Sequence, residues 1–167
     1  PAGARSALQG VRFMGTQINP QLSWADIERM RGRWQGKLVL KGLLCVEDAK
    51  RSVEIGADGI VLSNHGGRQL DSCATGIELV GQCAAEVGDR LSIIVDGGFR
   101  RGSDVLKAIA LGADAVMLGR PALYGLAAGG EAGVAHALSL LRVEMERAMT
   151  LLGCHSLDEL GPHLIKT

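Results

Sequence analysis

The chain has 167 residues, of which 47% are hydrophobic and only 3% aromatic, so it can bury one core built mainly from aliphatic side chains. Its 18 basic and 18 acidic residues cancel, which excludes the basic footprint of a nucleic-acid-binding protein. Its 4 cysteines lack paired metal-ligand spacing, so no metal site is expected, and no apolar run is long enough to span a bilayer.

Along the chain, apolar runs alternate with helical patterns. Residues 1–21 show little periodicity, and we expect a loop or linker from the missing N-terminal half of a longer fold. Ser23 has the spacing of a helix N-cap. Expected strands are 38–40, which ends at Lys41-Gly42, then 60–63, 93–95 and 115–118. Expected helices are 46–55, 77–87, one capped by Ser103 that runs to Leu111, 134–152, and a short one capped by Ser156 and Glu159.

This alternation predicts an α/β fold. Four apolar strands suited to burial on both faces, each followed by a helix, indicate a parallel sheet with helices outside. The glycine-rich strand ends are typical of barrel βα-loops rather than of a Rossmann fingerprint. Residues 22–167 are therefore expected to form the C-terminal half, about four βα units, of a TIM (β/α)8 barrel with C-terminal helices. Its two open strand edges need a missing half, another chain or a dimer to cover them.

The segment Ser63-Asn64-His65-Gly66-Gly67-Arg68-Gln69-Leu70-Asp71 follows the second expected strand. Chemistry in parallel α/β barrels is done at this end of the strands. A histidine can move a proton near neutral pH, and an arginine can hold a carboxylate by two parallel hydrogen bonds. A lone histidine is more often structural, but Arg68 and the intervening glycines favour proton abstraction by His65 from a small organic acid.

The next two strands end in Asp96-Gly97-Gly98-Phe99-Arg100 and in Gly119-Arg120. Backbone N–H groups exposed by glycines, together with two arginines, would form an anion cradle, and barrels often bind phosphate at their last two strands. The alternative is that the glycines only make tight turns and the arginines are solvated. Lys41, at the end of the first strand, could stabilise negative charge on a substrate or cofactor.

These segments resemble the FMN-dependent α-hydroxy acid oxidase and dehydrogenase family, over nearly everything from Leu22 onward. The resemblance implies oxidation of an (S)-2-hydroxy acid to the 2-oxo acid with reduction of FMN. It implies His65 as the base, Arg68 as the group that grips the substrate carboxylate, and Lys41 beside the flavin ring. Ser63 would contact the isoalloxazine, and the ribityl phosphate would be held by Asp96, Gly97, Gly98, Phe99, Arg100, Gly119 and Arg120.

The same resemblance implies a site completed by the N-terminal half of the barrel. The family's active-site tyrosines and the aspartate that pairs with the catalytic histidine would lie before Pro1, so the polypeptide alone is expected to be inactive and to bind FMN weakly. A homo-oligomer, a tetramer by resemblance, is expected. So is a cytoplasmic location, with peripheral contact with the inner membrane left open.

Gly42-Leu43-Leu44 and Leu123-Tyr124-Gly125-Leu126 are similar to the mandelate dehydrogenase branch of the family, which favours an aryl 2-hydroxy acid. The alternatives are a lactate or glycolate type of oxidase, and a non-catalytic half-barrel that uses only its phosphate cradle. Inosinate and dihydroorotate dehydrogenase barrels share a strand-end phosphate site but lack His65 and Arg68 in this loop. The electron acceptor stays open.

Overall fold

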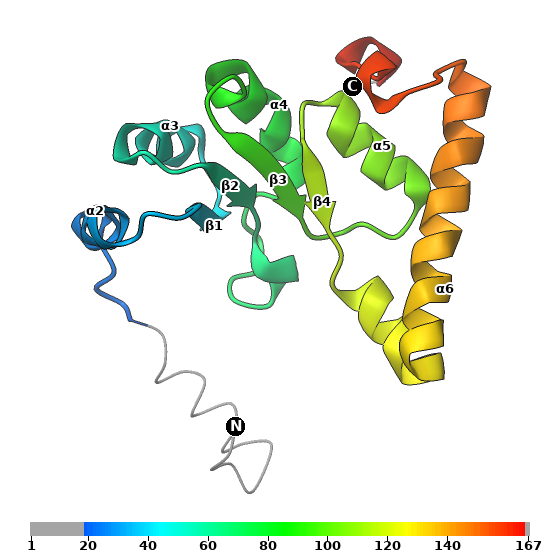
Figure 1. Cartoon of the computed structure of the whole chain (residues 1–167), viewed down its shortest axis with the longest axis horizontal. Coiled ribbons are helices and arrows are strands. Elements are labelled where there is room, and N and C mark those ends of the chain that lie inside the picture. Colours follow the sequence, from blue (N-terminus) through cyan, green and yellow to red (C-terminus); the bar gives the residue numbers. More distant parts are fainter. Residues whose placement is uncertain (1–18, 166–167) are drawn as a thin grey trace, which may run out of the picture. The chain divides into compact units, whose positions relative to one another are not determined.

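The computed structural model describes residues 19–165 (Figure 1). The chain divides into one unit that ends at Gln35 and a second that begins at Gly36. In the first unit, helix α2 covers Trp24–Arg33, and the backbone N–H of Ser23 donates to Asp26 Oδ2 at 2.8 Å, which confirms the N-cap. The predicted linker 1–21 falls on residues 1–18, outside the described part, and on a turn at 20–21, so its boundary stays a prediction.

The second unit is built on four parallel strands in the order β1-β2-β3-β4 (Figure 1). These are β1 (Val39–Leu43), β2 (Gly59–Leu62), β3 (Ser92–Asp96) and β4 (Ala115–Met117). In register, Leu40 lies beside Ile60 and Ile60 beside Ile93. Because parallel strands in register carry their carboxyl ends to one edge, the segments that follow them are brought together there. The predicted parallel sheet is confirmed.

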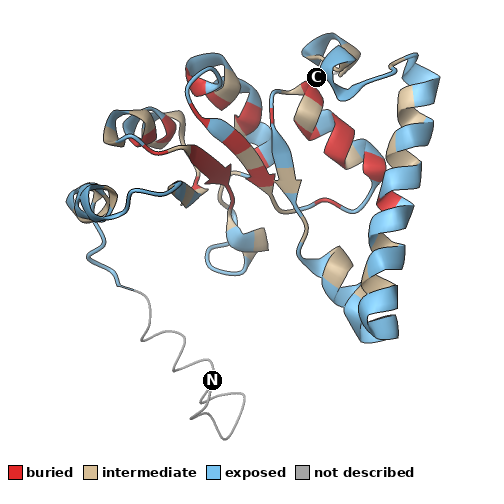
Figure 2. Cartoon of the chain, in the orientation of Figure 1, coloured by how far each residue is buried: buried red, intermediate tan, exposed pale blue. Residues whose placement is uncertain are grey.

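Helices α3 (Val46–Ile55), α4 (Gly76–Val87) and α5 (Gly102–Ala110) connect the strands and pack along the sheet (Figure 1). Right-handed crossovers between neighbouring parallel strands place all such helices on one face. The core lies between these helices and the sheet, where buried residues concentrate in β2, β3 and the facing sides of α4 and α5 (Figure 2). Ile60, Leu62, Ile93 and Val95 are all 0% exposed.

The edge strands differ from the central ones. Val39 on β1 is 45% exposed and Met117 on β4 is 41% exposed, although both are apolar side chains in a parallel sheet. Parallel sheets normally have both faces covered. The described residues 36–165 thus form an open half of the barrel, as predicted, with apolar side chains left on the edge strands.

The structure differs from the predicted helices in three details, although residues 134–152 are helical as predicted. Helix α5 begins at Gly102 with Arg101 as N-cap, and not at a Ser103 cap, because Asp104 Oδ2 accepts hydrogen bonds from the N–H groups of Arg100 (3.0 Å) and Arg101 (2.9 Å). The predicted helix 134–152 is the second arm of α6 (Arg120–Leu152). The expected last helix is instead two 3-10 turns, Leu157–Glu159 and Pro162–Leu164.

Helix α6 is bent rather than continuous. Gly129 and Gly130 have non-helical backbone angles, so a first arm from Arg120 turns back into the longer second arm (Figure 1). The arms touch at two glycines, since a Cβ added to Gly125 would lie 2.5 Å from the carbonyl oxygen of Gly133. Arg120 lies at the start of the first arm, three residues after the end of β4, and the bend directs the second arm away from it. No helix within residues 19–165 has the length and apolar character needed to cross a membrane.

Candidate active site

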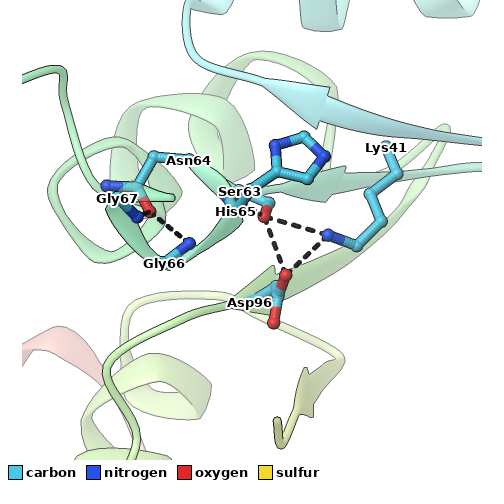
Figure 3. A network of polar contacts seen from close by, with 7 residues as sticks. All are labelled: Lys41, Ser63, Asn64, His65, Gly66, Gly67 and Asp96. Atoms are coloured by element: carbon cyan, nitrogen blue, oxygen red, sulfur yellow. Dashed lines mark hydrogen bonds and ion pairs between the residues drawn. The ribbon is translucent and has the colours of Figure 1, made fainter. Parts of the chain in front are cut away.

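Three polar side chains meet at the carboxyl ends of β1, β2 and β3 (Figure 3). The Lys41 ammonium donates to Asp96 Oδ2 at 2.6 Å and to Ser63 Oγ at 3.0 Å. The Ser63 hydroxyl donates in turn to Asp96 Oδ2 at 2.7 Å. Ser63 is fully buried, whereas the Lys41 side chain is 35% exposed and that of Asp96 19%. We call Lys41, Ser63 and Asp96 the polar triad.

The polar triad holds an ionised carboxylate. Burial of Asp96 opposes its ionisation, but hydrogen bonds from Lys41 and Ser63 and the positive charge of Lys41 outweigh burial and keep the pKa of the carboxyl below its ordinary value of 3.8. The negative charge of Asp96 is therefore already compensated by the Lys41 ammonium. Since a third of the Lys41 side chain reaches solvent, the ammonium can still meet a bound molecule.

Lys41 reaches the triad through an irregularity in β1. The pairing with β2 shifts between Lys41 and Leu43, which leaves Gly42 as the extra residue of a β-bulge. Gly42 has φ +101, and a Cβ added there would lie 3.1 Å from His65 Cε1. The imidazole of His65 therefore lies against the bare Cα of Gly42, and a bulge of this kind re-aims the neighbouring side chains.

His65 occupies a left-handed backbone conformation with φ +57, at the start of a 3-10 turn over His65–Gly67. Its N–H donates to Ser63 Oγ at 3.0 Å, which joins the turn to the polar triad. Asn64 Oδ1 accepts hydrogen bonds from the N–H groups of Gly66 and Gly67 at 3.0 and 3.2 Å (Figure 3). Asn64 was not among the predicted site residues, although an Asn directly before such a turn has the signature of an Asx turn.

The predicted carboxylate-binding residue Arg68 ends this turn, with its backbone N–H donating to the carbonyl of His65 at 3.4 Å. Its side chain is exposed, and no hydrogen bond joins its guanidinium to the polar triad within residues 19–165. The structure thus brings Lys41, Ser63, His65 and Asp96 together, with Arg68 three residues along the same loop as the imidazole. An imidazole and a guanidinium so placed can serve proton transfer and carboxylate binding.

The predicted anion cradle lies at the ends of β3 and β4. Gly97 and Gly98 have φ +106 and +83, and a Cβ added to Gly98 or to Gly119 would meet nothing within 4 Å. The backbone is thus open at both loops. Arg120 is exposed and its Nη2 lies 3.5 Å from the position of a Cβ on Gly66, so this arginine stands beside the His65 turn.

Phe99 and Arg100, which follow Gly98 in the loop after β3, differ in burial. Phe99 is only 5% exposed, so its ring packs in the core and only its backbone can contact a ligand. Arg100 is exposed, as are Gly119 and Arg120. Two arginines and two open glycine loops fit a phosphate, and the Lys41 ammonium offers a hydrogen-bond donor to a second polar group of a larger ligand. The donor set therefore fits a flavin mononucleotide. Within the described chain, no group of three His, Cys, Asp or Glu side chains has a metal-binding arrangement.

Comparison with known proteins gives concordant results. The family model for FMN-dependent dehydrogenases matches residues 2–167. The L-lactate oxidase of Nostoc sp. is 47% identical over 89% of this chain and 40% of its own length. The (S)-mandelate dehydrogenase of Pseudomonas putida is 46% identical over 92% of this chain and 39% of its own length.

A solved structure, described as that of the monotopic membrane protein (S)-mandelate dehydrogenase, superposes with a TM-score of 0.89 at 43% identity. The match covers 99% of this chain and 44% of that one. The chain therefore spans about two fifths of the length of the relatives it matches.

Proposed function

This chain belongs to the FMN-dependent dehydrogenase family, and we propose that it supplies the base, the carboxylate-binding group and the phosphate cradle for oxidation of an (S)-2-hydroxy acid to the 2-oxo acid. The observation that carries the proposal is the convergence of the His65 turn and the polar triad at one edge of the sheet, 3.0 Å apart through His65 N–H and Ser63 Oγ. Bound FMN supplies the acceptor for the two electrons that leave the substrate.

His65 and Arg68 have different roles toward the substrate: Arg68 binds it and His65 accepts a proton from it. The guanidinium of Arg68 binds the substrate carboxylate, which fixes the acid with its α-carbon toward the imidazole. Two hydrogens leave the substrate, one from the α-carbon and one from the hydroxyl group. His65 takes one of them as a proton, and bound FMN would accept the other together with the two electrons. The side chain of His65 is exposed, so that proton can pass on to solvent.

Lys41 is proposed to stabilise negative charge on the cofactor. Its ammonium is held at one strand end by two hydrogen bonds, at 2.6 and 3.0 Å, and so presents a fixed positive charge where negative charge develops during the reaction. Ser63 and Asp96 hold that ammonium. Ser63 is proposed to border the flavin ring, and Asp96, the first residue of the proposed phosphate loop, is proposed to anchor that loop by pairing with Lys41. Gly97, Gly98, Phe99, Arg100, Gly119 and Arg120 are proposed to hold the phosphate, with Phe99 contributing through its backbone.

The proposal extends to an aryl acid of the mandelate type, with a lactate-type acid as the second candidate. The sequence similarity supports both, because the lactate oxidase and the mandelate dehydrogenase are 47% and 46% identical to this chain. The segments Gly42–Leu44 and Leu123–Leu126 favour the aryl acid.

We further propose that activity requires the barrel half that precedes this segment in its relatives. The open sheet, with Val39 and Met117 exposed, supports this requirement. We also propose that the whole protein forms a homo-oligomer. We propose a cytoplasmic location for it, with peripheral attachment to the inner membrane. The attachment is supported by the relative described as a monotopic membrane protein, and fractionation of cells that express the whole protein tests it.

The experiment is to fuse this chain behind the part of the Pseudomonas putida (S)-mandelate dehydrogenase that precedes the matched segment. We call this fusion the completed barrel. We expect it to bind FMN, with a flavin absorbance band, and to be bleached without oxygen by at least one of mandelate, lactate and glycolate. His65→Gln and Arg68→Gln should each abolish bleaching while FMN stays bound. A completed barrel that holds FMN and is bleached by none of these acids would refute the proposed activity and favour a binding module.

A further inference from the structure

His65 adopts a backbone conformation that is uncommon for a residue other than glycine. Its φ of +57 lies in the left-handed region, which carries a steric penalty for any residue with a Cβ. Such a conformation persists only where neighbouring groups hold it in place. The hydrogen bonds around His65 therefore identify the groups that decide where its imidazole points.

Two side chains, both from residues that precede His65, provide these hydrogen bonds. Ser63 Oγ accepts from the N–H of His65 itself at 3.0 Å. Asn64 Oδ1 accepts from the next two N–H groups, those of Gly66 at 3.0 Å and Gly67 at 3.2 Å (Figure 3). A single amide oxygen thus fixes the two peptide units that follow His65, and all of these hydrogen bonds are partly buried.

The amide oxygen of Asn64 also lies against the next strand end. A Cβ added to Gly97 would be 3.7 Å from Asn64 Oδ1, so Asn64 packs where the phosphate loop begins. On the other side, the imidazole of His65 lies against Gly42, 3.1 Å from a Cβ added there. The His65 turn is therefore held between β1 and β3, and Asn64 is its contact on the β3 side.

We propose that Asn64 is a positioning residue for His65: its Oδ1 holds Gly66 N–H and Gly67 N–H, fixes the left-handed turn and thereby aims the imidazole at the substrate. This inference rests on the proposed function, in which His65 is the base. Asn64 has no hydrogen bond to Lys41 or Asp96 among those of the described chain, whereas Ser63 bonds to both. Substitution of Asn64 therefore separates an effect on the base from an effect on the cofactor, which substitution of Ser63 cannot do.

The test uses the completed barrel with Asn64→Leu, which has similar size but no acceptor, and Asn64→Asp, which keeps the acceptor oxygen. For Asn64→Leu we expect kcat to fall by about 10- to 100-fold, because a small misplacement of a catalytic group costs that much. The dissociation constant of FMN should change by less than about threefold, since the phosphate loops lose no hydrogen bond. The KM should rise by a smaller factor than kcat falls, because Arg68 follows the turn and its guanidinium loses no hydrogen bond.

Asn64→Asp should recover most of kcat, because a carboxylate accepts the same two hydrogen bonds. A variant that merely unfolded the protein would not show this rescue by the residue that keeps the acceptor oxygen. If Asn64→Leu does not fold, Asn64→Ala removes the acceptor with a smaller side chain, and it is measured in the same way.

A second readout does not depend on turnover. Amide hydrogen exchange at Gly66 and Gly67 should be accelerated in Asn64→Leu and close to wild type in Asn64→Asp. Unchanged kcat and unchanged exchange in Asn64→Leu would overturn the inference, as would loss of FMN in place of loss of kcat. Failure of the proposed function has a different signature, because His65→Gln would then turn over like the wild type.

Discussion

The Lys41–Asp96 pair in the polar triad gives a prediction about stability and its dependence on pH. Asp96→Asn removes the negative charge and replaces one acceptor oxygen with an NH2 group that cannot face the Lys41 ammonium. Exposed ion pairs contribute about 0–1 kcal/mol, and breaking a fully buried pair costs about 3–5 kcal/mol. With Lys41 35% exposed and Asp96 19%, solvent screens the pair in part, so we expect a loss of about 1–2 kcal/mol at pH 7.

The sign of the pH dependence follows from the lowered pKa of Asp96. Hydrogen bonds from Lys41 and Ser63 outweigh burial and hold this pKa below 3.8 in the folded chain. A group of this kind stabilises the fold at pH values above its unfolded pKa, and the stabilisation is lost as the pH falls through the folded pKa. The difference between wild type and Asp96→Asn should therefore be constant above about pH 5 and shrink below about pH 3.8.

The assay is urea unfolding followed by circular dichroism, at pH 7 and at pH 2.5. Asp89→Asn is the matched control, because the Asp89 side chain is 83% exposed and its contact with Arg90 spans 3.4 Å. The control should change the free energy of unfolding by less than about 0.5 kcal/mol at either pH. An Asp96→Asn cost no larger than that of the control, or a cost as large at pH 2.5 as at pH 7, would refute the proposed energetics of the triad.

Three further outcomes are expected. Gly42→Ala places a Cβ 3.1 Å from the imidazole of the proposed base, so it should lower kcat of the completed barrel by about 10- to 100-fold. The control is Gly56→Ala, which is also at positive φ but in open space and should lower only the stability. Equal kcat in the two variants would contradict this. Arg120→Gln should weaken FMN binding by about tenfold in fluorescence titrations, and Arg142→Gln, on the exposed surface of α6, should leave it unchanged. Ile60→Ala, at a fully buried position, should reduce the free energy of unfolding by about 3 kcal/mol in a urea titration, and a loss below 1 kcal/mol would argue against the described core.

The alternation of strands and helices could be predicted because it depends on local pattern. Short aliphatic runs such as Ile93–Val95 and capping residues such as Ser23 carry their own periodicity and hydrogen-bonding preference. The prediction failed where a residue distant in sequence competes for a helix end. Glu144 Oε2 accepts from the N–H of Gly102 at 2.7 Å, and that contact from α6 helps to begin α5 before Ser103.

The candidate site divides in the same way. The sequence by itself determined which chemical groups stand at the strand ends, since His65 and Arg68 occupy one loop and the phosphate loops carry their own glycines. Only the tertiary structure decided that Lys41 and Asp96, 55 residues apart, share one hydrogen bond. Lys41 and Asp96 are brought together by the register of the parallel strands. That register depends on packing across the whole sheet rather than on any local pattern.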